Sequence, residues 1–242
     1  MGLQPKYLDF IAECAHITMG DFSGRTMLEL GNQHISDEDR RACPGILEKT
    51  GKQYFENRGV KHVSIDLNAE DGALPIDLSQ PIGRPEWRHS FDIVTNAGTS
   101  EHVEPLEAQY ECFRNIHECL RPGGIAVHIV PSAEGLREKG RWRNHCNNYY
   151  SREFFDMLAA HNGYRVVSFQ FSDELILTCL QKTEDRPFMA DRSAFLEPIT
   201  RREGGIIYRG INDNSVGART RFAWVARKKI VRLRKRVRRL TS

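Results

Sequence analysis

The sequence lacks any long hydrophobic run. No apolar stretch in the chain approaches the roughly 18 residues that a membrane-spanning helix needs. The first ten residues lack a basic start followed by an apolar core, so we expect no secretory signal peptide. Lys6 stands where a myristoylation motif requires Ser or Thr, which argues against a lipid on Gly2. These absences favour a cytoplasmic protein.

The sequence also lacks paired cysteines. Its 6 cysteines form no CxxC pair, and their spacing matches neither a zinc site nor a disulfide framework. We therefore expect buried, reduced thiols, as is usual in the cytosol. A chain of 242 residues is long enough to bury a full core without a disulfide or a structural metal.

Acidic residues are absent from the last part of the chain. Residues 219–242 carry 11 Lys and Arg side chains and no Asp or Glu, whereas residues 1–218 carry 24 basic and 32 acidic side chains, a net charge of −8. Apolar residues recur every three or four positions from Phe222, which predicts a basic amphipathic helix. Three roles stay open for this tail: contact with an anionic membrane surface, binding of RNA or DNA, or packing on the acidic body.

Apolar patterning predicts alternating strands and helices between the termini. Short apolar runs predict seven strands, over residues 26–30, 62–66, 73–77, 91–96, 125–130, 165–171 and 175–181. Helical spacing of apolar residues predicts helices over 3–18, 46–58, 106–120 and 151–160. The Arg121–Gly124 segment reads as a turn, and Ser151 as the cap of the last helix.

This alternation predicts an α/β fold with a doubly wound, mostly parallel sheet. The last two strands form a hairpin, so the seven-stranded sheet should contain one antiparallel strand. We divide the chain into an N-terminal helix (1–20), one α/β domain (21–183), an irregular extension (184–218) and the basic tail (219–242).

Acidic residues lie at or near the ends of three consecutive predicted strands. Because ligands bind at the carboxyl ends of strands in such sheets, Glu29, Asp66 and Asp77 should share one site. Asp66 could accept hydrogen bonds from ribose hydroxyls and Asp77 from an adenine amine, although each could also cap a turn. Gly31 would let the backbone approach the ligand. The segment after Gly31 is no glycine-rich phosphate nest, which favours a cationic nucleoside ligand over a dinucleotide.

Five segments, in order, resemble one protein family. They are TMLELGN (26–32), VSIDLN (63–68), ALPIDL (73–78), FDIVTNAGTSEHV (91–103) and LRPGGIAVHIVP (120–131). With them, residues 20–182 resemble the class I S-adenosylmethionine-dependent methyltransferases, of the kind called methyltransferase type 11. The resemblance implies a Rossmann-like fold and S-adenosyl-L-methionine as the cofactor.

The resemblance also implies cofactor-binding positions. The methionine part would lie beside Glu29, Gly31 and Asn32, the ribose beside Asp66 and Leu67, the adenine beside Asp77 and Leu78, and the sulfonium beside Asn96, Ala97 and Gly98. The sequence departs from the family in having only Gly31 where two or three glycines are usual. Asn32 would then supply by its side chain what a glycine loop supplies by its backbone.

Two adjacent polar residues follow the fourth predicted strand. Glu101 or His102 could face the methyl acceptor and take its proton, or His102 could merely cap the next helix. With a distant histidine the pair could hold a divalent metal, as in some hydroxyl-methylating members of the family. Two adjacent ligands do not define a metal site, so the sequence predicts none.

The loop before the helix at 151 is dense in polar and aromatic residues. His145 is the favoured acceptor-side histidine of this loop, and it would assist catalysis together with Glu101 and His102. Hydrogen bonding and stacking to a polar acceptor would come from Arg141, Arg143, Asn144, Tyr149 and Tyr150. The alternative is a polar surface loop with the two tyrosines packed beneath it.

Three functions remain open. The first is methyl transfer to a hydroxyl or amine of a sugar, glycan or small metabolite, with the tail on the cytoplasmic face of a membrane. The second is an RNA methyltransferase whose tail captures the substrate, and nucleic acid is the less favoured partner. The third is a non-catalytic binding module, in which the altered glycine loop no longer holds the cofactor. No motif indicates an oligomeric state.

Overall fold

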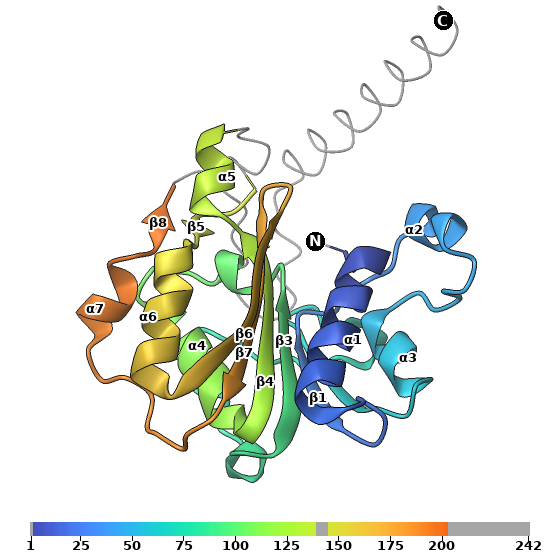
Figure 1. Ribbon diagram of the computed structural model, residues 1–242, viewed down its shortest axis with the longest axis horizontal. Coiled ribbons are helices and arrows are strands. Elements are labelled where there is room, and N and C mark those ends of the chain that lie inside the picture. Colours follow the sequence, from blue (N-terminus) through green and yellow to red (C-terminus); the bar gives the residue numbers. More distant parts are fainter. Residues whose placement is uncertain (1, 139–144, 203–242) are drawn as a thin grey trace, which may run out of the picture.

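The fold is built on one central sheet, seen in a computed structural model that describes residues 2–138 and 145–202 (Figure 1). The sheet has six strands in the order β2-β1-β3-β4-β7-β6. Their bounds are Thr26–Leu30 (β1), Lys61–Ile65 (β2), Phe91–Ala97 (β3), Leu120–Pro131 (β4), Tyr164–Ser172 (β6) and Leu175–Lys182 (β7). The expected turn at Arg121–Gly124 thus lies within β4, where the register with β3 shifts.

The strand directions confirm the predicted fold class. Strands β2, β1, β3 and β4 pair in parallel, and only β7 runs antiparallel to its two neighbours, β4 and β6. The hairpin of β6 and β7 therefore supplies the one antiparallel strand of a doubly wound α/β sheet.

The predicted strand at 73–77 is wrong, and the sheet has six strands instead of seven. Leu74 makes a single bridge to Ile65, donating its N–H to Ser64 and accepting from the N–H of Asp66. The next residue is Pro75, which has no N–H to continue the ladder. The pairing therefore stops after one residue.

Helices cover both faces of the sheet (Figure 1). Helices α1 (Pro5–Met19) and α3 (Gly51–Glu56) lie to one side, and α4 (Ala108–Cys119), α6 (Arg152–Asn162) and α7 (Arg192–Leu196) to the other. The remaining helices are short: α2 (Asp37–Ala42), α5 (Ala133–Glu138), and the 3-10 turns η1 (Glu70–Gly72), η2 (Pro85–Trp87) and η3 (Ser100–His102). No helix within the described ranges is long and apolar enough to cross a membrane.

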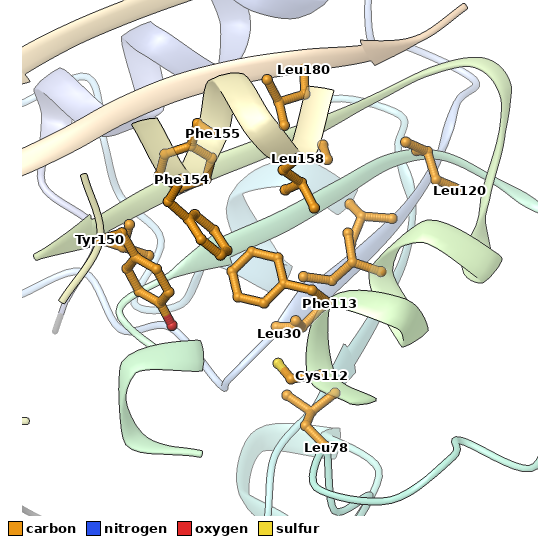
Figure 2. Close-up of a cluster of buried hydrophobic side chains, with 14 of the residues drawn as sticks. Leu30, Leu78, Cys112, Phe113, Leu120, Tyr150, Phe154, Phe155, Leu158 and Leu180 are labelled. Atoms are coloured by element: carbon orange, nitrogen blue, oxygen red, sulfur yellow. The ribbon is translucent and has the colours of Figure 1, made fainter. Parts of the chain in front are cut away.

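Alternate side chains of the central strands belong to two separate hydrophobic cores, one on each face of the sheet. Leu28 and Val94 point to the side of α4 and α6, whereas Met27 and Ile93 point to the side of α1. Figure 2 shows the first core, in which Phe113 of α4 lies against the aromatic rings of α6. A strand buried on both faces is apolar almost throughout, which explains the continuous runs in the sequence.

Two predicted segments end differently in the structure. The helix expected over 46–58 is confined to α3, because Thr50 caps it by accepting the N–H of Gln53 at 3.2 Å. Part of the extension expected to be irregular is ordered: β8 (Thr200–Arg201) pairs with β5 (Asn148–Tyr149), and Phe195 of α7 is buried in the core. The domain boundary near residue 183 stays a prediction, and the tail at 219–242 lies outside the described residues.

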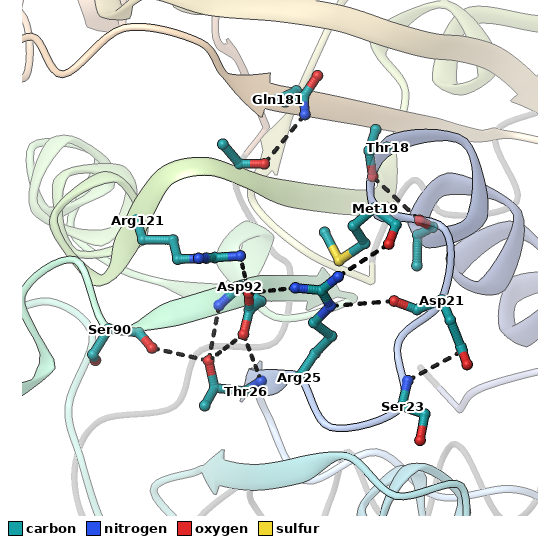
Figure 3. A network of polar contacts seen from close by, with 12 residues as sticks. Thr18, Met19, Asp21, Ser23, Arg25, Thr26, Ser90, Asp92, Arg121 and Gln181 are labelled. Atoms are coloured by element: carbon teal, nitrogen blue, oxygen red, sulfur yellow. Dashed lines mark hydrogen bonds and ion pairs between the residues drawn. The ribbon is translucent and has the colours of Figure 1, made fainter.

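A polar network fastens the amino ends of β1 and β3, opposite the predicted site (Figure 3). The carboxylate of Asp92 accepts the backbone N–H and the hydroxyl of Thr26, both at 2.8 Å. Arg25 and Arg121 pair with the same carboxylate. This network holds the two strands in register from the end that carries no predicted function.

Candidate functional site

The carboxyl ends of β1, β2 and β3 meet at one edge of the sheet. Leu30 of β1 is in register with Ile65 of β2 on one side and with Asn96 of β3 on the other. The residues that follow these strands are therefore neighbours, as the strand-end argument predicts. They are Gly31, Asp66 and Gly98.

Glu29 is wholly buried just before this edge. One carboxylate oxygen accepts the hydroxyl of Ser64 at 3.0 Å, and the other has no hydrogen-bond partner. Burial raises the pKa of Glu29 from 4.5 to about 8. The side chain is thus largely protonated at neutral pH, and it packs inside the protein beneath the edge of the sheet.

His62 lies beside Glu29, with 3.9 Å between Nε2 and the carboxylate. Burial lowers the pKa of His62 to about 3, and the imidazole stacks on Phe55. Both groups are therefore neutral near pH 7, and the pair is no salt bridge. Sequence reasoning gave His62 no role, because nothing local links it to Glu29.

Asp66 is half-buried and faces two backbone amides. Its carboxylate accepts the N–H of Asn32 at 2.7 Å on one oxygen and the N–H of Asn68 at 2.9 Å on the other. A carboxylate offers about four acceptor positions, so two remain for an external donor. That arrangement fits a pair of ribose hydroxyls.

Asn32 secures the loop after β2 and does not act as a free polar side chain. Its amide donates to the carbonyl of Glu70 at 3.2 Å and to the carboxylate of Asp71 at 3.0 Å. The backbone N–H of Asn32 is the group that meets Asp66. Asn32, just after β1, therefore binds the segment after β2 through both its backbone and its side chain.

Gly31 makes the close turn at the end of β1. Its φ of +79° lies in the left-handed region, and a Cβ there would collide with the hydroxyl of Thr99. The side-chain amide of Gln33 donates its N–H to the same hydroxyl at 3.4 Å, and the buried side-chain oxygen of Gln33, Oε1, has no hydrogen-bond partner. A buried acceptor of this kind suits an ammonium group, as a methionine moiety carries.

A second glycine lies at this turn, although it is distant in the sequence. Gly51, the first residue of α3, donates its N–H to the carbonyl of Gln33 at 2.8 Å. A Cβ on Gly51 would collide with Glu29 and would approach Leu3 to 2.8 Å. His34 bridges to Thr50, so residues 33–35 and 49–51 run side by side while 36–48 loop out. Sequence reasoning missed Gly51, because it expected the glycines to follow Gly31 directly.

The other predicted cofactor positions lie at or below the same edge. Asp77 accepts the N–H of Ser79 at 2.9 Å, Leu67 is half-buried, and Leu78 is buried in the core. Asn96 is fully buried, and its amide turns inward to Ser100 at 2.8 Å and His128 at 3.1 Å. The Asn96 side chain therefore points into the protein. A ligand at this strand end would lie against the backbone of Ala97 and Gly98.

Glu101, His102 and His145 come together beside these strand ends. One ligand-type atom from each lies within 4.8 Å of the others, and the two imidazole rings meet edge to face at 4.8 Å. Glu101 is wholly buried, and neither carboxylate oxygen has a hydrogen-bond partner. Burial raises the pKa of Glu101 to about 7 and lowers that of His145 to about 4. The structure thus joins the three residues that the sequence placed on two separate loops.

Two amide side chains hold η3 in place. Asn148 donates to the carbonyls of Glu101 at 3.2 Å and Val103 at 3.1 Å. Gln109 of α4 donates to the carbonyls of Ser100 and Val103, both at 2.7 Å. Both side chains are fully buried, and neither was singled out from the sequence.

The two tyrosines of the polar loop have a packing role, whereas the sequence predicts contact with an acceptor. Both are fully buried. The Tyr150 hydroxyl donates to the side-chain oxygen of Gln109 at 2.7 Å and is hydrogen-bonded to the hydroxyl of Ser100 at 2.9 Å, and Tyr149 donates to the carbonyl of Cys146 at 3.0 Å. The remaining predicted acceptor contacts, Arg141, Arg143 and Asn144, lie outside the described residues.

Comparison with known protein families gives one match. Residues 10–169 match a family described as "Methyltransferase domain". This range includes all the strand ends described above, as well as η3 and the loop at 145–150. No curated protein matches the chain.

Solved structures with a similar fold are remote in sequence. One is 1,6-didemethyltoxoflavin-N1-methyltransferase from Burkholderia thailandensis, with bound 1,6-didemethyltoxoflavin and S-adenosylhomocysteine: 15% identity, 72% of this chain and 76% of that chain, TM-score 0.48. Another is the N-methyltransferase NodS from Bradyrhizobium japonicum with S-adenosylhomocysteine: 15% identity, 75% and 89% coverage, TM-score 0.48. A TehB-like methyltransferase from Corynebacterium glutamicum has 17% identity, 71% and 87% coverage, and a TM-score of 0.45.

Proposed function

Because the chain belongs to the methyltransferase domain family, we propose that it transfers a methyl group from S-adenosylmethionine to a hydroxyl or amine of a polar acceptor. A sugar, a glycan or a small metabolite is the favoured acceptor class. The observation that carries the proposal is the meeting of Glu101, His102 and His145 beside the strand ends where the cofactor would bind.

The residues at the strand ends fit the cofactor. Asp66 would hold the ribose, and the buried side-chain oxygen of Gln33 would accept from the amino group of the methionine part. Gly31 would border that part, and Asp77 the adenine. When bound, S-adenosylmethionine supplies an electrophilic methyl group on a cationic sulfonium, and the backbone carbonyls of Ala97 and Gly98 would lie near that charge.

The protein's own part in the reaction is to align the acceptor and to manage its proton. Methyl transfer is a displacement at carbon, so positioning supplies much of the rate. A hydroxyl acceptor must lose a proton before or during attack. Glu101, His102 and His145 form the polar group to which we assign that proton, and Asn148 positions Glu101 by binding its carbonyl.

Cofactor binding is the first test. Calorimetric titration of the full chain with S-adenosylmethionine should give one site, and Asp66→Asn should weaken it about 10–100-fold, because two charge-assisted hydrogen bonds are impaired. Asp156→Asn, an exposed substitution on α6, is the matched control and should bind normally. No binding by the unaltered chain would refute the proposal and favour the non-catalytic module.

Transfer of a labelled methyl group into a fractionated extract would identify the acceptor. Label in a glycan or small-metabolite fraction supports the proposal, and label in RNA supports the alternative of an RNA methyltransferase. Cofactor binding without transfer to any fraction would contradict a role in catalysis.

We further propose that the protein is cytoplasmic and contacts a membrane surface through residues 219–242. The support is the sequence, which has 11 basic side chains and a stripe of apolar residues in this segment. The basic side chains would attract anionic lipid, and the apolar stripe, which a fully solvated helix does not need, would enter the membrane surface. When vesicles of anionic lipid are sedimented, the full chain should pellet with them, whereas a chain ending at Ala218 should stay in the supernatant. Equal sedimentation of both chains would contradict the proposal.

A further inference from the structure

We propose that Glu101, His102 and His145 form a binding site for a divalent transition metal of the zinc type. This inference deepens the proposed function. Only the role of the metal toward the acceptor rests on that function. Metal binding itself depends on the three side chains alone.

The donor set is the first argument. One carboxylate and two imidazoles lie with their ligand atoms within 4.8 Å of one another. Two ligands of one tetrahedral zinc ion, each about 2.0–2.2 Å from it, are separated by roughly 3.5 Å. Small side-chain rotations would therefore close the cluster around an ion. Two nitrogen donors favour zinc, cobalt, nickel or iron, because magnesium and calcium prefer oxygen ligands.

The state of Glu101 is the second and independent argument. The side chain has no exposed surface, and neither of its oxygens has a hydrogen-bond partner. Burying a carboxyl group without any partner is costly, and proteins usually avoid it. A cation between Glu101 and the two histidines would satisfy both the charge and the vacant acceptor positions of this carboxylate.

The surroundings of the cluster are built to hold it. Asn148 links the two ligand-bearing segments: it lies three residues after His145 and donates to the carbonyls of Glu101 and Val103. Tyr149 fastens the same loop through the carbonyl of Cys146 at 3.0 Å. Metal ligands are commonly oriented by such secondary contacts.

The number of ligands indicates what the ion would do. Three protein ligands leave at least one coordination position open, as in catalytic zinc sites. An oxygen of the acceptor could occupy that position next to the methyl donor. A bound metal would lower the pKa of such an oxygen, so a hydroxyl acceptor would release its proton to water while the three side chains serve as ligands. The cluster would therefore favour a hydroxyl acceptor over an amine.

The test uses cobalt as a spectroscopic probe on the full chain. After treatment with a chelator, titration with Co²⁺ should produce visible absorption bands that saturate at one ion per chain, and Zn²⁺ should abolish them. Glu101→Gln and His145→Ala should each weaken Co²⁺ binding at least about 100-fold, since loss of a direct ligand costs more than loss of a secondary contact. His161→Ala, which removes an exposed histidine of α6, is the matched control and should bind as the unaltered chain does.

Three outcomes decide the inference. Saturating bands that vanish in both ligand variants, while urea unfolding shows the variants folded, support it. Absence of bands in the unaltered folded chain overturns it, as do bands that persist in both variants. Calorimetry with S-adenosylmethionine on the same samples separates the two proposals: cofactor binding without cobalt binding refutes the metal site alone.

Discussion

Replacing Glu29 by Gln should change how the stability of the protein depends on pH. Glu29 is wholly buried, and burial raises its pKa from 4.5 to about 8. The folded chain therefore keeps a proton that the unfolded chain releases. For an acid with a raised pKa, the stabilisation is complete below pH 4.5 and is lost as the pH rises toward 8.

The magnitude follows from the size of the shift. Within this window the free energy of unfolding falls by about 1.4 kcal/mol for each pH unit. Between pH 6.5 and 8 the loss is therefore about 2 kcal/mol. Three buried histidines, His62, His117 and His128, have pKa values lowered to about 3, 4 and 3 by burial. Lowered histidines reduce stability only as the pH falls below about 6.5, so they do not contribute in this window.

Urea unfolding followed by circular dichroism at pH 6.5, 7.25 and 8 would measure this dependence. Glutamine has nearly the shape of protonated glutamate and cannot ionise, so Glu29→Gln should remove about 2 kcal/mol of the loss seen in the unaltered chain. Glu153→Gln, at an exposed position of α6, is the matched control and should keep the full loss. Thiol ionisation above pH 8 affects all three proteins alike. Parallel stability curves for Glu29→Gln and the unaltered chain would refute the assignment of a protonated Glu29.

Three further substitutions test the packing around the site, each by urea unfolding at pH 7. Gly51→Ala should cost about 1–3 kcal/mol, because the new Cβ collides with Glu29; unchanged stability would contradict the close approach. Asn148→Ala should cost about 1–3 kcal/mol, since two carbonyls lose their buried donor, and a neutral effect would argue against this link. Asp92→Asn should also cost about 1–3 kcal/mol, with a smaller cost at high salt; a salt-independent cost would show that its arginine pairs contribute little.

The sequence was sufficient for most of the sheet because buried strands have a strong local signal. Six of the seven predicted strands are present, and the antiparallel partner of β4 follows from the hairpin at its end. The seventh fails at Pro75, where a single missing N–H ends the ladder. Helix α3 is shorter than predicted, because Thr50 caps it at a point that apolar spacing does not mark.

The site was only partly predictable, because its contacts join residues far apart in the sequence. Strand ends can be located from a local pattern, so the sequence predicts that Glu29, Asp66 and Ala97 lie near one edge of the sheet, and the strand register brings these strand ends together. The pairing of Glu29 with His62 depends on strand register, and the support of η3 by Asn148 depends on a loop that returns to it. Neither has a local signal.

Two glycines that are distant in the sequence, Gly31 and Gly51, lie together at the turn after β1. The segment between Gly31 and Gly51 contains α2, yet the backbone bond from Gly51 to Gln33 brings the two glycines to one turn. Each is required for a different reason: Gly31 for its left-handed φ, and Gly51 for its closeness to Glu29. Such a turn therefore requires glycines that are close in space. The spacing of glycines along the chain reveals this closeness only when no segment is inserted between them. Taken alone, the single glycine after β1 argues against a cofactor loop. With Gly51 beside it, the turn has two glycines, and that argument no longer holds.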